Sequence, residues 1–227
     1  MTLACALVAA GLAAGGFDLA SHLRLDGAQL DLRGTAVADA DLMALEGAAF
    51  RRVRVVLLAS TGISDAALPF LRHLHVEELD LYRTRVTGAG MAQLEGLPLR
   101  RLTLSGTAID DAGLCHLAAL PLESLAASDT AVGDAGLRWL RSMPLRRLDL
   151  SRTKITDAGL AELARLRELE LLDVSYTALS GAGLDSLRRA RRLRELYVAG
   201  TSVPAAAIER LRAARPDLKI VALAPGR

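Results

Sequence analysis

Short hydrophobic alternations recur along the chain at nearly constant intervals. Each has the form L-x-L or a close variant and is followed by a threonine, as in LDLYRT, LTLSGT and LDLSRT. A period of two predicts a short strand with one buried face, and the leucines spaced three apart that follow predict a helix with one buried face. The threonines that mark the eight units are Thr35, Thr61, Thr84, Thr107, Thr130, Thr153, Thr177 and Thr201.

Successive threonines are 23 to 26 residues apart. A unit of this size cannot bury its apolar face alone, whereas stacked units share one continuous core. We therefore expect an α/β solenoid, a curved right-handed stack with a parallel sheet on its concave face and helices on its convex face. The expected layout is an apolar segment over residues 1–28, eight repeats and a ninth, terminal strand (PDLKIVAL) over 29–223, and a tail over 224–227.

Polar residues and glycines mark the predicted helix starts. A residue whose side-chain oxygen suits helix capping follows the buried aliphatic residue in five units: Ser64, Thr87, Asp110, Thr156 and Ser180. An aspartate that suits the positive helix N-terminus often comes next, at Asp65, Asp111, Asp134 and Asp157. A glycine precedes the core leucine, and we expect its missing side chain to let the helix pack closely, at Gly113, Gly136, Gly159 and Gly183.

Composition agrees with a thin aliphatic core and leaves the compartment open. Hydrophobic residues make up 52% of the chain but aromatic residues only 3%. The net charge is +2, yet the segment from Gly183 onward contains ten basic and only four acidic residues. The two cysteines, Cys5 and Cys115, form no disulfide framework. The uncharged stretch from Thr2 to Phe17 is either a cap helix or a weak export signal that lacks a basic start, so the cytoplasm is favoured over export.

These motifs resemble the leucine-rich repeat family, and most closely the subtype with an ITDAGL helix start. That subtype occurs in ribonuclease-inhibitor-like and F-box-associated repeats and in many bacterial proteins. The resemblance covers about residues 30–223 and implies a protein-interaction scaffold. One departure is that threonine replaces the usual asparagine or cysteine, so a ladder of hydroxyls between neighbouring turns is expected. The subtype also suggests a substrate-recognition subunit of a ubiquitin-ligase-like complex, although no F-box-like segment is seen.

The strand pattern places a set of polar and aromatic side chains on the concave face. All three tyrosines of the chain fall on this face or at its edge, and Tyr and Arg commonly anchor interfaces. The alternative is that these tyrosines only cover neighbouring strands. The residues expected to bind a protein partner are Asp80, Tyr82, Arg83, Arg101, Arg147, Asp149, Arg152, Asp173, Tyr176 and Tyr197.

Other chemistries have weaker support, and we expect no catalytic residue, no metal site and no cofactor. Asp149 and Asp173 lie on neighbouring strands, but an open face does not supply the desolvation that tunes paired carboxylates for catalysis. His73 and His75 lack a further metal ligand nearby, and Cys115 and His116 cannot converge on one atom.

Three surface features leave further alternatives. The basic run from Arg188 to Glu195 offers a second function, binding to nucleic acid or an anionic membrane, although no aromatic residues are interleaved with it. Phe70 and Trp139 share one helix position and are expected to be half-buried against neighbouring helices, with a contact site on the convex face as the alternative. We therefore expect a protein partner in preference to nucleic acid, and contact with a membrane only through the N-terminal segment.

Overall fold

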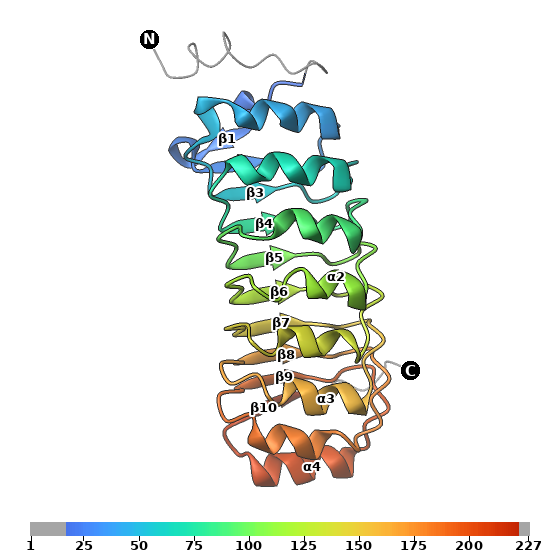
Figure 1. Cartoon of the computed structure of the whole chain (residues 1–227). Coiled ribbons are helices and arrows are strands. Elements are labelled where there is room, and N and C mark those ends of the chain that lie inside the picture. The colour runs from blue at the N-terminus through green and yellow to red at the C-terminus, as the bar shows by residue number, and fades with distance from the viewer. Residues whose placement is uncertain (1–16, 223–227) are drawn as a thin grey trace.

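The computed structural model describes residues 17–222 as a stack of repeats, each with one strand and one helical segment (Figure 1). The strands form one ten-stranded sheet in chain order, parallel throughout except that β1 pairs antiparallel with β2. Their bounds are β1 Leu23–Arg24, β2 Gln29–Asp31, β3 Val55–Leu57, β4 Glu78–Asp80, β5 Arg101–Thr103, β6 Ser124–Ala126, β7 Arg147–Asp149, β8 Leu171–Asp173, β9 Glu195–Tyr197 and β10 Lys219–Val221.

The α/β solenoid is thus the observed fold, and the expected terminal strand is β10. The short antiparallel β1, which covers the edge of β2, was not expected. Three predicted features lie outside the described residues: residues 2–16 of the export or cap segment, Cys5 within that segment, and the tail over 224–227.

The helical segments are shorter and tighter than the leucine spacing predicted. Three are α-helices, and the others are 3₁₀ helices among the residues described. A 3₁₀ helix rises about 2.0 Å per residue against about 1.5 Å in an α-helix, so it crosses a short repeat with fewer residues. The bounds are α2 Asp111–Cys115, α3 Asp157–Leu163 and α4 Ala205–Ala214, with 3₁₀ helices η1 Ala20–His22, η2 Leu25–Gly27, η3 Asp39–Glu46, η4 Ala48–Phe50, η5 Asp65–His73, η6 Ala89–Leu94, η7 Gly136–Leu140 and η8 Leu184–Arg189.

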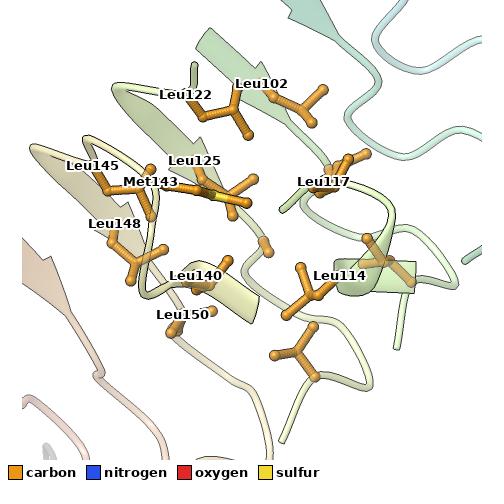
Figure 2. Close-up of a cluster of buried hydrophobic side chains, with 14 of the residues drawn as sticks. Leu102, Leu114, Leu117, Leu122, Leu125, Leu140, Met143, Leu145, Leu148 and Leu150 are labelled. Atoms are coloured by element: carbon orange, nitrogen blue, oxygen red, sulfur yellow. The ribbon is translucent and has the colours of Figure 1, made fainter. Parts of the chain in front are cut away.

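One leucine-rich core runs the length of the stack between the sheet and the helical segments. Figure 2 shows part of it, with strand leucines of β5, β6 and β7 on one side and leucines of the helical segments on the other. Leu102, Leu125 and Leu148 come from the strands and are at most 2% exposed. Side chains that alternate with these leucines point away from the core, and we call the surface they form the open face.

The repeat threonines close turns inside their own units. In all eight repeats the threonine Oγ1 donates to the carbonyl oxygen three residues earlier, at 2.5–2.8 Å. Thr107, for example, bonds to Leu104. The expected hydroxyl ladder between neighbouring turns is therefore wrong, because each donor is used within its own repeat.

Aspartates make the links between repeats. Asp134 accepts hydrogen bonds from Thr156 of the next repeat, from its backbone N–H at 2.9 Å and from its Oγ1 at 2.5 Å. We call this arrangement the aspartate clasp, and it also joins Asp39 to Ser64, Asp65 to Thr87 and Asp157 to Ser180. Asp65 and Asp157 lie in the first turn of their own helical segments, as expected, and their carboxylates also bind the following unit. Ser180, expected to cap a helix, donates its hydroxyl to Asp157.

The repeat glycines allow the close packing that the sequence predicted, and they also make room for these aspartates. A Cβ at Gly159 would lie 2.3 Å from Asp134 Oδ1, and one at Gly136 would lie 2.6 Å from an oxygen of the equivalent aspartate. The third repeat has Gly88 where the repeats on either side have aspartate, and a Cβ there would lie 2.6 Å from Asp110 Oδ1. A carboxylate at position 88 would therefore oppose another carboxylate.

A column of alternating charge runs along the side where the chain enters the strands. Arginine and glutamate alternate there from one repeat to the next, beginning at Arg54 and ending at Arg194. The backbone N–H of each residue donates to the backbone carbonyl of its counterpart in the preceding repeat. Ion pairs link Arg54–Glu77, Arg100–Glu123 and Arg146–Glu170, and Arg194 binds Asp217. Exposed pairs of this kind contribute about 0–1 kcal/mol each.

Candidate interaction surface

The parallel register brings the predicted open-face residues into rows across the sheet. Asp149 lies opposite Asp173, and Asp173 lies opposite Tyr197. Asp80 occupies the same row on β4. The predicted register of these strand residues is therefore the observed one.

The carboxylates of this row have a structural use. Asp80 Oδ1 accepts the backbone N–H of Tyr82 at 3.0 Å, and Asp149 and Asp173 accept the N–H two residues later in the same way, at 2.9 and 2.8 Å. This accounts for the L-D-L pattern without any catalytic role.

Two of the repeats that lack this aspartate use a serine of the preceding repeat instead. Ser105 Oγ accepts the N–H of Ser128 at 3.1 Å, and Ser175 Oγ accepts the N–H of Ala199 at 3.2 Å. Ser105 and Ser175 are consequently buried, with 5% and 6% of their surface exposed. These two serines, two residues beyond the middle of their strands, are therefore closed to a partner.

The residue directly before each threonine has a left-handed backbone in all eight repeats. We call these positions the left-handed column. Glycine occupies it three times, at Gly34, Gly106 and Gly200. The other five residues carry an intrinsic cost of roughly 1–2 kcal/mol each for positive φ. They are Ser60, Arg83, Asp129, Arg152 and Tyr176, with φ of 51–57°.

Three successive members of this column stack on one another. The Arg152 guanidinium lies 4.2 Å from the centroid of the Tyr176 ring, and Tyr176 is 53% exposed. The ring also leans over Gly200, where a Cβ would come within 2.3 Å of it. An arginine stacked on an aromatic ring has fewer free rotamers and keeps its in-plane N–H donors available. We call Arg152, Tyr176 and Gly200 the Arg–Tyr stack.

A similar but looser pair lies on the third repeat. The Arg83 guanidinium is 5.2 Å from the Tyr82 ring centroid, and a Cβ at Gly106 would lie 3.0 Å from Arg83 Cγ. Arg101, which was also expected to bind a partner, forms an ion pair with Glu78 at 2.7 Å.

Tyr197 pairs with an acidic side chain of its own strand. Its hydroxyl donates to Glu195 Oε2 at 2.6 Å, and the Lys219 ammonium lies 3.3 Å from the same oxygen. The hydrogen bond from Tyr197 lowers the pKa of Glu195, and its bond to Glu195 raises the pKa of Tyr197. Of the residues expected to bind a partner, Arg152 and Tyr176 thus belong to the Arg–Tyr stack, whereas Tyr197 belongs to this separate acid–tyrosine pair.

Two of the histidines singled out in the sequence make local contacts. His73 Nε2 lies 3.6 Å from Glu46, and His116 Nδ1 lies 2.9 Å from Glu95. The part of the chain that the structure describes holds no group of three or more His, Cys, Asp or Glu side chains placed for a metal ion.

The two large rings of the helical side differ in exposure. Phe70 is partly buried against the core, as expected. Trp139 is 37% exposed and carries the Arg138 guanidinium 5.0 Å from its ring centroid. Trp139 therefore offers an exposed ring on the opposite side of the molecule from the open face.

Much of the C-terminal basic run is ion-paired. Arg188 contacts Asp185, Arg192 contacts Glu168, and Arg194 contacts Asp217. Acidic side chains thus offset part of the positive charge from which a polyanion site was expected. No helix within residues 17–222 has both the length and the apolarity needed to cross a bilayer.

The sequence signal that could have revealed the Arg–Tyr stack lies in the left-handed column. Glycine at three of eight equivalent positions indicates a positive φ, and large side chains at the others are then exceptional. Gly200 was not singled out, although its lack of a side chain is what admits the Tyr176 ring.

Comparisons with known proteins agree with this geometry. The family model described as "Leucine Rich repeat" matches residues 141–164. The fold resembles the leucine-rich repeat ectodomain of the Arabidopsis receptor kinase HAESA, solved with an N-terminally extended IDA peptide hormone ligand. The TM-score is 0.59 at 17% identity, over 86% of this chain and 34% of that chain. The chain thus spans about a third of that structure's length. No curated protein shows significant similarity to this chain.

Proposed function

We infer that this chain, which is a leucine-rich repeat protein, binds a partner protein on the open face of its sheet. The fold is typically a binding scaffold without enzymatic activity. The observation that carries the proposal is the placement of the tyrosines. Tyr82, Tyr176 and Tyr197 all lie on the open face or its edge, while the described core is filled by leucines and other aliphatic residues.

Exposed tyrosines on a rigid sheet are suited to binding. Tyrosine supplies a large contact area at low entropic cost, and exposed apolar rings on a soluble protein tend to mark interfaces. Tyr176 and Arg152 also occupy positions whose left-handed backbone glycine adopts without cost in three other repeats, so the repeat itself does not require these side chains. The HAESA ectodomain has a peptide ligand, so a peptide can be bound by this fold in that protein.

The test uses a variant that removes the ring without endangering the fold. Tyr176→Gly relieves the positive φ and should leave the free energy of unfolding unchanged or higher by about 1 kcal/mol. We expect it to lose most of the partner recovered with wild-type protein in affinity purification followed by mass spectrometry. Trp139→Ala, which removes an exposed ring from the helical side, is the matched control and should retain the partner.

The proposal fails if Tyr176→Gly and Tyr197→Ala together recover the same proteins as wild type. It also fails if Trp139→Ala alone abolishes recovery, because the contact would then lie on the helical side.

A further inference from the structure

We propose that the Arg–Tyr stack recognises a single carboxylate on an extended segment of a partner protein. The inference rests on the proposed function and adds the chemistry of the partner at that site. It starts from a difference between the acidic and the basic side chains of the open face and its edge.

Aspartates of the strand row serve the fold, whereas three arginines of the open face and its edge do not. Asp149 and Asp173 each accept a backbone N–H of their own repeat. Arg83, Arg147 and Arg152 are exposed, and within residues 17–222 none of them makes a side-chain hydrogen bond or an ion pair. Their guanidinium donors are therefore left to a partner or to water.

Arg152 is the best prepared of the three. Its guanidinium is the closer of the two stacked on tyrosine, at 4.2 Å against 5.2 Å for Arg83. Arg147 has no ring beneath it in this part of the chain. A stacked guanidinium presents its fork of N–H groups in a fixed plane, which matches the two oxygens of a carboxylate.

The backbone adds an independent argument. Arg152 and Tyr176 occupy consecutive repeats of the left-handed column with φ of 57°, where glycine would carry no penalty. Strained positions of this kind concentrate at binding sites, because a side chain there needs a use that offsets its cost. The structure shows no intramolecular use for the Arg152 donors among the residues it describes.

The surrounding charge favours an isolated carboxylate over a polyanion. Asp129 precedes Arg152 in the same column, and Asp149 and Asp173 occupy the row beside it. A nucleic acid would lay consecutive phosphates over these carboxylates, which is repulsive. A peptide can place one acidic side chain at Arg152 and neutral or basic side chains elsewhere.

The experiment selects ligands from a library of random dodecapeptides displayed on phage. Wild-type protein and Arg152→Gln are panned in parallel, with Arg167→Gln as the control because Arg167 is also exposed and lacks an ion pair within the described residues. We expect Asp or Glu to be enriched at one peptide position with wild type and Arg167→Gln. Arg152→Gln should lose that enrichment, and should bind the wild-type-selected peptides roughly 10-fold or more weakly, as loss of a charge-assisted pair implies.

Several results would overturn the inference. Peptides that depend on Tyr176 but show no acidic enrichment would refute it and leave the proposed function intact. Enrichment of Lys or Arg would assign recognition to Asp149 and Asp173 instead. Binding of a fluorescent oligothymidylate that weakens in Arg152→Gln would point to a polyanion. A library that yields no binders to any variant would count against both the inference and the proposed function.

Discussion

Replacement of Gly159 by alanine should destabilise the protein, against the usual preference of helices for alanine. In an unobstructed helix this change gains about 1 kcal/mol. Here the new Cβ would lie 2.3 Å from Asp134 Oδ1, so the carboxylate must leave its clasp with Thr156. It would also lie 3.0 Å from methyl groups of Ile155 and Leu137, which can shift at smaller cost.

The magnitude follows from the two hydrogen bonds of the clasp. Bonds to a charged group contribute about 1.5–3 kcal/mol each, and the partly buried setting favours the lower end, or about 3 kcal/mol for the pair. Asp134→Ala should therefore cost about 3 kcal/mol. Gly159→Ala should cost about 2 kcal/mol, which is the same loss less the helix gain.

A double-mutant cycle distinguishes a shared clasp from two separate effects. If the effects were independent, the double variant would lose about 5 kcal/mol; if Gly159→Ala acts by displacing the Asp134 carboxylate, the double variant should lose only about 2 kcal/mol. Urea denaturation followed by circular dichroism measures each variant. Gly62→Ala, where a Cβ meets nothing within 4 Å, is the control and should be stabilising by about 0.5 kcal/mol. Additive losses, or a Gly159→Ala protein more stable than wild type, would refute the reasoning.

Four further predictions concern the cap, acid stability, the core and the turns. Arg215→Met removes a buried guanidinium that donates to three backbone carbonyls, so it should cost about 3 kcal/mol, and the pKa of Asp217 should rise from about 2 toward 3.8 in an NMR titration. Burial raises the pKa of Asp157, but its hydrogen bonds from the next repeat outweigh this and lower it overall, so its stabilisation should fade as pH falls below 3.8, and Asp157→Asn should flatten that acid loss in urea titrations. Leu148→Ala should cost about 3–4 kcal/mol by urea denaturation and speed hydrogen exchange first in the adjoining repeats. Thr107→Val should cost only about 1 kcal/mol, since the carbonyl that loses the hydroxyl keeps the backbone N–H bond; a loss above about 3 kcal/mol would contradict this.

Periodic features of the sequence were sufficient to predict the fold. The L-x-L spacing determined the strand register residue by residue, because a one-residue slip would expose the leucines. The lengths of the helical segments were not predictable in the same way. Leucines three apart fit both an α-helix and a 3₁₀ helix, and the choice depends on how much chain remains once the turns are formed.

The hydrogen-bond partners of the threonines and aspartates could not be predicted from one repeat alone. A threonine or an aspartate can bond within its own unit or with the next, and only the stack decides. Thr107 bonds inside its repeat, whereas Asp134 bonds across the boundary. The open-face prediction succeeded for the exposure of Tyr176, but the partner of Tyr197 depended on side-chain torsions that no pattern encodes.

Because arginine and glutamate alternate in the charged column, adding or removing an odd number of repeats differs in effect from adding or removing an even number. Removing one repeat, for example the one that contains Glu123, would bring Arg100 beside Arg146, whereas removing two adjacent repeats would restore the sequence of signs. Shortened or lengthened versions of this protein should therefore tolerate changes in steps of two more readily than in steps of one.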